Sequence, residues 1–158
     1  MEQRFGMYEC MFLASQATAA DFAGLIEHID YLLGRANAEV ISMRKWDERR
    51  LAFPIEKQKR GIYILAYVKA PREMVTKLER DVAISDKIMR MLIVRADHLS
   101  LEEMKAQDGR TELATEAKLR ATQAEEQTRR GEAVVAGAPE QQEEPEVVAA
   151  GTEESDED

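Results

Sequence analysis

The chain has 158 residues, enough for one ordinary domain with an extension, and its 22 basic and 31 acidic side chains give a formal net charge of −9. An acidic chain ordinarily repels nucleic acid, but residues 1–99 hold 16 basic and 14 acidic side chains, whereas residues 100–158 hold 6 and 17. The acidity therefore belongs to the last third of the chain, and the average charge describes neither part.

The first two predicted elements are a strand and a helix. Residues 5–14 are rich in aromatic, Met and Leu side chains, which favours a buried strand. Thr18 followed by Asp21 resembles a capping box with Asp in place of Glu, and it predicts the start of a helix. Asn37 tolerates a left-handed backbone and is expected to end that helix. Between them, one apolar stripe recurs at helical spacing: Phe22, Leu25, Ile26, Ile29, Leu32 and Leu33.

The next two strands are expected to form a long β-hairpin. Residues 39–53 mix β-branched and polar side chains and lead to Pro54, which cannot donate to a central ladder and so indicates an edge strand. Residues 56–61 are polar and predict the turn. Residues 62–69 are typical of the returning strand.

A second helix and a fourth strand complete the predicted domain. Pro71 suits the first turn of a helix, residues 74–82 continue it with apolar residues at helical spacing, and residues 88–95 form the last strand. The order β-α-β-β-α-β over residues 5–98 predicts an α+β, ferredoxin-like fold of the split βαβ type. We expect a four-stranded antiparallel sheet with two helices on one face.

The C-terminal third has a different character. Residues 99–131 favour a helix but carry only a weak apolar stripe, so we expect a charged extension that is solvated or dependent on a partner. Residues 132–158 contain ten acidic and no basic side chains. Such a segment buries too little apolar surface to offset its chain entropy, and it is predicted to be a disordered acidic tail.

No motif in the sequence indicates catalysis, a cofactor or a metal. GxGxxG, Walker and GxSxG motifs are absent from the sequence. Cys10 lies in the middle of a buried strand and is expected to pack in the core instead of acting as a nucleophile. His28 and His98 are expected at the surface, and with one cysteine they form no zinc-type cluster. We therefore expect neither an enzyme nor a small-molecule substrate.

The sequence also favours a soluble, cytoplasmic protein. A single cysteine excludes an intrachain disulfide and fits a reducing compartment. The apolar stretches are far shorter than the roughly 18–20 residues that a membrane span needs. The first residues lack the basic and apolar segments of a signal peptide.

Both faces of the predicted sheet are apolar. In residues 62–69 and 88–95, apolar side chains stand at both the odd and the even positions, and therefore on both faces of the sheet. In an antiparallel sheet with one face in water, apolar residues alternate with polar ones. Because two helices cover one face, we expect the other to meet a partner or to be shielded in part by the C-terminal segment. The alternative is a twisted sheet with a moderately apolar outer face.

Basic side chains cluster around the predicted hairpin. Such clusters contact phosphate oxygens and release counterions, which gives salt-dependent affinity without base readout. Trp46, Phe53 and Tyr63 lie nearby in sequence and are available to stack or pack. The alternative is that the charges are solvated or protect an edge strand. The candidate RNA-binding residues are Arg44, Lys45, Arg49 and Arg50 on the second strand, Lys57, Lys59 and Arg60 in the turn, and Arg90 and Arg95 on the fourth strand.

Three motifs carry a resemblance to a known family. Residues 7–9 (MYE) resemble its opening aromatic–Glu pair. Residues 49–63 contain its most characteristic motif, RRLAFPI, followed by a lysine and then GIY. Residues 86–95 resemble its last strand. In this order and spacing, residues 5–97 resemble the bacterial ribosomal protein S6 family of the small (30S) subunit.

The resemblance implies a ferredoxin-like fold without catalysis. It also implies binding to the central domain of 16S rRNA together with small-subunit protein eighteen, as a heterodimer. Arg49 and Arg50 become candidates for structural or RNA contacts, and Asp47 departs from the small residue that the family often has there. With the resemblance, the candidate partner-binding residues are Tyr8, Tyr63, Leu65 and Tyr67.

Two other functions stay open at this point. The first is an enzyme or ligand sensor, because ferredoxin-like domains host many functions. It would need a phosphate-cradling loop or paired polar side chains at one end of the sheet, and the sequence indicates neither. The second is a protein-interaction module without RNA, such as a homodimer through the open face of the sheet.

Overall fold

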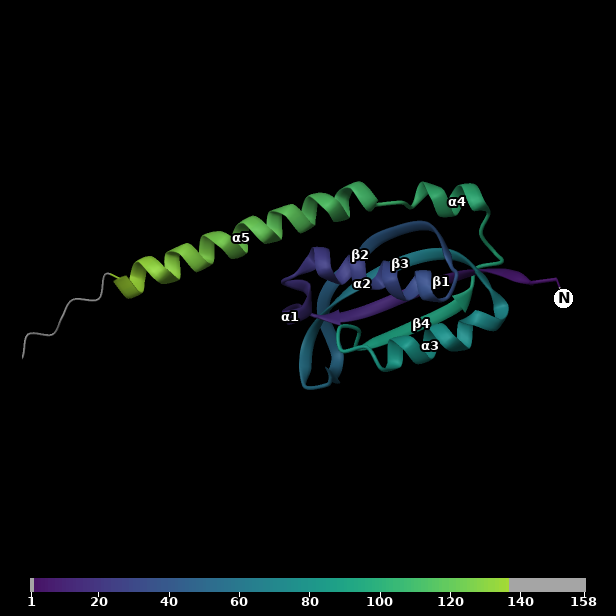
Figure 1. The fold of residues 1–158 in the computed structure, drawn as a ribbon, viewed down its shortest axis with the longest axis horizontal. Helices are drawn as coiled ribbons and strands as arrows, with labels where there is room; N and C mark the ends of the chain where they lie inside the picture. Colours follow the sequence, from purple (N-terminus) through teal and green to yellow (C-terminus); the bar gives the residue numbers. More distant parts are fainter. Residues whose placement is uncertain (1, 137–158) are drawn as a thin grey trace, which may run out of the picture.

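The computed structural model describes residues 2–136, and its sheet and helices form an α+β fold (Figure 1). The elements are β1 (Phe5–Ser15), α1 (Gln16–Ala19), α2 (Phe22–Arg35), β2 (Glu39–Ile55), β3 (Gln58–Pro71), η1 (Arg72–Met74), α3 (Val75–Ala83), β4 (Arg90–Arg95), α4 (Leu101–Ala106) and α5 (Arg110–Ala136). The antiparallel strands lie in the order β2-β3-β1-β4, which makes β2 and β4 the edge strands. This topology confirms the predicted ferredoxin-like fold and the edge position of β2.

The helix start in the first half of the chain differs from the prediction. Ser15 caps α1 by accepting the N–H of Thr18 at 3.1 Å, and Asp21 caps α2 by accepting the N–H of Gly24 at 3.1 Å. The Thr18–Asp21 capping box was therefore wrong, because two helices with separate caps follow one another there. Asn37 has a φ of 50° just after α2, which confirms it as the residue that ends this helix.

The main core lies between the sheet and the helices α2 and α3. The predicted α2 stripe is confirmed: Ile26 packs at the core margin, and its other five residues are buried. Leu78 and Val82 bring α3 against the same face. Burial of this apolar surface is the dominant favourable term in folding. The strand residues facing these helices are Tyr8, Cys10, Phe12 and Ala14 of β1 and Ile62, Ile64, Ala66 and Val68 of β3.

The helix α4 lies on the other face of the sheet and forms a second, smaller core. Met104 of α4 and Ala96 are buried there together with Leu65 and Tyr67 of β3. A capping box starts α4: Glu103 N–H donates to Ser100 Oγ at 3.2 Å, and Ser100 N–H donates to Glu103 Oε2 at 2.7 Å. The C-terminal segment thus shields part of the open face. This was one of the two expectations for that face; the other was a contact with a partner.

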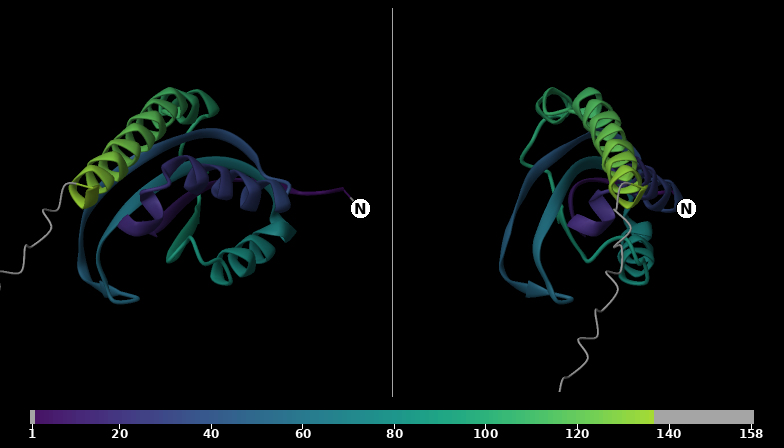
Figure 2. Two further views of the ribbon diagram at one scale, coloured as in Figure 1. Left: turned by 60° about the vertical axis from the view of Figure 1, so that its left-hand side comes forward. Right: turned by 90° about the vertical axis from the view of Figure 1, so that its left-hand side faces the viewer.

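The chain then crosses the edge of β2 and continues into α5. Met43 of β2 donates its N–H to Asp108 Oδ1 at 3.0 Å, and its carbonyl accepts the N–H of Gly109 at 3.0 Å. Leu113 of α5 is buried in the main core beside α2, and α5 runs on past the sheet (Figure 2). We call residues 101–120 the strap. The extension was expected to be solvated or dependent on a partner. The strap instead packs on its own domain, because polar and ionic contacts replace the missing apolar stripe.

Two boundaries also differ from the expectations. Glu56 and Lys57 alone form the hairpin turn, with φ of 48° and 64°, so Lys59 and Arg60 lie on β3. Residues 132–136, expected within the disordered tail, continue α5, and the rest of that predicted tail, 137–158, lies outside the described residues.

Pro71 ends β3 and precedes η1, which places it one position before the predicted first helical turn. Its backbone φ of −60° and ψ of 134° is extended, so Pro71 caps the short helix without entering it.

Candidate nucleic-acid and partner interface

The cations in the middle of β2 contact the strap. Arg44 donates to Gln107 Oε1 at 3.4 Å. Lys45 Nζ lies 2.8 Å from Glu116 Oε1 and 3.6 Å from Glu48 Oε2. In this structure both side chains hold the chain's own C-terminal segment on the strand.

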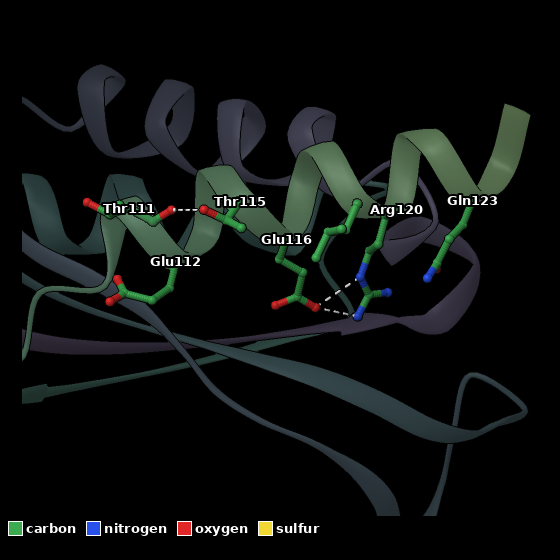
Figure 3. Close-up of a pocket in the computed structure, with 7 residues that line it drawn as sticks. Thr111, Glu112, Thr115, Glu116, Arg120 and Gln123 are labelled. Carbon is green, nitrogen blue, oxygen red and sulfur yellow. Dashed lines mark hydrogen bonds and ion pairs between the residues drawn. The ribbon is translucent and has the colours of Figure 1, made fainter.

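Arg120 is the centre of the ionic contacts that dock α5. Its Nη2 lies 2.6 Å from Glu48 Oε2 and 2.7 Å from Glu116 Oε1, and its guanidinium lies 5.2 Å from the centroid of the Phe22 ring. Figure 3 shows Glu116 and Arg120 facing one another along α5. Burial opposes ionisation of Glu116, but hydrogen bonds from Lys45 and Arg120 outweigh it and lower the pKa of this carboxyl.

A second contact anchors the start of α5. Both terminal nitrogens of Arg110 donate to the two carboxylate oxygens of Asp30 on α2, each at 2.8 Å. The hydrogen bonds to Asp30 outweigh partial burial and raise the pKa of Arg110. A two-pronged pair of this kind fixes orientation as well as distance. The hollow beside α5 in Figure 3 is lined by side chains of this docking region, including Thr111, Thr115 and Glu116.

The remaining hairpin cations gather at the far end of β2 and β3. Arg49 lies 3.6 Å from Asp47 and 6.0 Å from the centroid of Trp46, and it stays more than half exposed. Arg90, at the start of β4, lies 5.7 Å from the centroid of Phe53 near the hairpin tip. The structure therefore brings one end of β4 against the hairpin. The exposed cations of this end, which we call the hairpin cluster, are Arg49, Arg50, Lys57, Lys59, Arg60 and Arg90.

Arg95 lies apart from the hairpin cluster. It pairs opposite Tyr8 at the other end of β4, and its guanidinium lies 2.8 Å from Asp97. Both partners of that pair are more than half exposed, so the contact contributes little to stability.

An apolar groove of about 430 Å³ lies between the hairpin tip and β4. Leu13 and Leu51 are buried at its base, and Tyr63 meets Trp46 edge to face with ring centroids 5.6 Å apart. Gly61 permits this packing, since a Cβ there would collide with the side chain of Leu13.

The four candidate partner-binding residues do not form one surface. Leu65 and Tyr67 are buried beneath α4, where the Tyr67 hydroxyl donates to Glu9 Oε2 at 3.2 Å. Burial and the neighbouring Glu9 raise the pKa of Tyr67. Tyr8 lies on the opposite face in the main core, and Tyr63 lines the groove.

An apolar strip runs from the groove toward α4, and Met11 and Leu92 belong to both the strip and the groove lining. On β4, Leu92 is 64% exposed and Val94 is 41% exposed. On β1, Met7 and Met11 lie on the same face and are half-buried, with Glu9 between them opposite Val94. We call these four residues the open strip.

The other candidate reactive groups have structural roles. Cys10 is fully buried, and burial together with the nearby Glu9 raises its pKa to about 12. His28 is partly exposed, and its Nε2 lies 2.6 Å from Ser85 Oγ. Burial and Lys87 lower the pKa of His28. Among residues 2–136, no group of three or more His, Cys, Asp or Glu side chains is arranged to hold a metal ion.

Sequence reasoning missed the groove and the ionic contacts of the strap. Leu51 and Ile55 belong to the RRLAFPI segment, whose departure from strict alternation was the available signal for a twisted hairpin end. The pairs Asp30–Arg110 and Glu48–Arg120 join residues 80 and 72 positions apart, and no local pattern indicates them. No helix of the described region is long and apolar enough to cross a membrane.

Comparison with known proteins gives one family and a consistent fold. A family model described as Ribosomal protein S6 matches residues 7–95. The crystal structure of 30S ribosomal protein S6 from Thermotoga maritima aligns with a TM-score of 0.55 and 22% identity, covering 66% of this chain and 99% of that one. The C-terminal domain of the MgtC protein from Mycobacterium tuberculosis aligns at 9% identity, covering 63% of this chain and 97% of that one. That alignment has a TM-score of 0.42.

Proposed function

The chain belongs to the ribosomal protein S6 family, and on that premise we propose that it binds the central domain of 16S rRNA together with small-subunit protein eighteen. As a member of this family, the chain is a structural protein of the small ribosomal subunit and not an enzyme, and it acts in the cytoplasm as part of the ribosome. The observation that carries the proposal is the presence of two adjoining surfaces: the six cations of the hairpin cluster, and the open strip, which meets that cluster at the groove lined by Met11, Arg90 and Leu92.

The hairpin cluster is the proposed RNA surface. Its six side chains are exposed and come from β2, the turn, β3 and β4. Cations presented in this way contact phosphate oxygens and release condensed counterions, which fixes the position of a protein on RNA. In this proposal Arg44 and Lys45 hold the strap, and Arg95 lies too far from the cluster to share its phosphates.

The open strip is the proposed surface for protein eighteen. Leu92 and Val94 present apolar area to solvent on an edge strand, and Met7 and Met11 continue it toward α4. An exposed apolar patch bordered by polar residues is typical of a protein–protein contact. Because Leu65 and Tyr67 are covered by α4, the partner would bind on the β1 and β4 side of this face.

The test replaces the hairpin charges in the full chain and measures binding to a 16S central-domain transcript with protein eighteen present. Each lost phosphate contact reduces the slope of log affinity against log salt by about 1. The variant with Lys57→Gln, Lys59→Gln and Arg60→Gln should bind more weakly and with a flatter slope.

A control with the same loss of charge is Lys105→Gln, Lys118→Gln and Arg130→Gln, at exposed positions of α4 and α5. This control should bind like the unaltered chain. Equal effects of the two triple variants would contradict the assignment of the hairpin cluster. Heterodimer formation without any RNA binding would favour the protein-interaction module instead.

A further inference from the structure

The groove beside the hairpin cluster combines an apolar interior with a cationic, aromatic rim. Leu13 and Leu51 are buried at its base. Phe53 stands at the rim and is 58% exposed, although a ring of that size would ordinarily be buried. The groove volume of about 430 Å³ lies within the range of small-molecule pockets.

Two aromatic rings near this groove each have a cation beside them. The Arg90 guanidinium lies 5.7 Å from the Phe53 centroid, and the Arg49 guanidinium lies 6.0 Å from the Trp46 centroid. Trp46 in turn contacts Tyr63, which lines the groove. The rim therefore presents aromatic rings with a guanidinium group next to each of them.

We propose that this groove receives an unpaired base of the bound RNA, stacked on Phe53, with Arg90 contacting the adjacent phosphate. This inference rests on the proposed function and adds the chemical class of the group that is bound. Proteins recognise unpaired RNA by stacking splayed-out bases on aromatic side chains and Arg planes. A base carries its phosphate with it, so an aromatic ring and a cation at the same opening match both parts of one nucleotide.

The charges around the groove favour RNA over a protein side chain as the occupant. All six members of the hairpin cluster lie at this end of the sheet, where they outnumber the acidic side chains Asp47, which is paired with Arg49, and Glu56 in the turn. A protein segment entering the groove would bring no matching charge unless it were acidic, whereas every nucleotide supplies one negative charge. The part of the open strip outside the groove, Met7 and Val94, holds no member of the hairpin cluster and therefore suits a protein partner better.

The experiment measures binding of the full chain, with protein eighteen, to a 16S central-domain transcript at several salt concentrations. Phe53→Leu should weaken binding about tenfold, as expected for the loss of one stacked base, and leave the salt slope unchanged. Phe53→Tyr keeps the ring and should bind as tightly as the unaltered chain. Arg90→Gln should both weaken binding and flatten the slope by about 1.

Phe5→Leu is the matched control. Phe5 is 46% exposed, its ring centroid lies 5.3 Å from Lys69 Nζ, and it sits at the opposite end of β1 from the groove. This variant loses an aromatic ring beside a cation without touching the groove, and its affinity for the transcript should not change.

Unchanged affinity of Phe53→Leu for the transcript would overturn the inference while leaving the proposed function intact. A loss of heterodimer formation by Phe53→Leu in the absence of RNA would also overturn it, because the groove would then hold the partner protein. If the unaltered chain fails to bind the transcript, the proposed function itself is wrong and the inference falls with it.

Discussion

Gly109 donates its backbone N–H to the carbonyl oxygen of Met43 at 3.0 Å and so holds the strap on the edge strand β2. The N–H of Met43 is satisfied by Asp108 Oδ1, so both ladder groups of that residue are occupied from within the chain. An edge strand with free ladder groups is a template for pairing with another chain. The strap protects this part of β2 from such pairing.

The close approach at Gly109 predicts a specific sensitivity to substitution. A Cβ at this position would stand 2.8 Å from Arg44 Cβ and 3.4 Å from Arg44 Cα. Gly109→Ala should therefore push the strap away from β2 and lower the free energy of unfolding by about 1–2 kcal/mol, measured by urea denaturation. Gly131→Ala is the control, because a Cβ there meets nothing within 4 Å, and it should cause no loss. Equal losses in the two variants would contradict this account of the strap.

The docking of α5 should depend on pH through Glu116. Its pKa is lowered in the folded state by Lys45 and Arg120 against the effect of burial, so the carboxylate contributes stability above its ordinary value of 4.5. That contribution is lost as the pH falls through the lower folded value. Unfolding free energies at pH 7 should drop by about 1 kcal/mol in Glu116→Gln, and the difference from the unaltered chain should vanish at acid pH. A constant difference across that range would contradict the prediction.

The backbone conformation of the hairpin turn should make some substitutions there stabilising. Glu56 and Lys57 both have positive φ, a conformation that two-residue hairpin turns fill most readily with Asn-Gly. Glu56→Asn should raise the free energy of unfolding by about 0.5 kcal/mol while Lys57 remains available to RNA. Lys57→Gly should stabilise by a similar amount but weaken binding to the transcript. If Lys57→Gly raised both the free energy of unfolding and the affinity for the transcript, Lys57 would not contact a phosphate.

Cys10 should behave as an unreactive core residue. Burial, with a contribution from Glu9, raises its pKa to about 12, and the thiolate is the form that reacts. In a thiol-exchange assay, the native chain should react only as fast as it unfolds, and the reaction should be complete at once in denaturant. Rapid labelling of the native chain would show that β1 opens locally.

The elements that follow apolar periodicity could be predicted from the sequence, and the strap could not. The α2 stripe and the alternating residues of β3 carry their burial in local spacing, which is why topology and core agree with expectation. The strap is held by two buried apolar side chains, Met104 and Leu113, and by charged pairs between distant residues such as Asp30 and Arg110. Charge pairs across 80 positions leave no periodic signal, so residues 99–131 were expected to be solvated or dependent on a partner.

The candidate site, like the fold, could be predicted from the sequence only in part. The basic residues near the hairpin are visible in the sequence, but their separation into strap contacts and a hairpin cluster depends on where α5 docks. Arg44 and Lys45 are adjacent to the Trp46 bulge, and nothing local indicates that Gln107 and Glu116 lie against them. Tyr8 was grouped with Tyr63 by motif, whereas the alternation of β1 places it on the helix face.

The affinity of the full chain for a 16S central-domain transcript, with and without protein eighteen, distinguishes the proposed function from the alternatives. We predict binding that tightens when protein eighteen is present. We also predict that binding falls by roughly 10³ between about 50 and 200 mM salt if all six hairpin cations contact phosphate. The proposed function would be contradicted by an affinity that changes neither with salt concentration nor with protein eighteen. It would also be contradicted if the chain fails to bind the transcript both with and without protein eighteen.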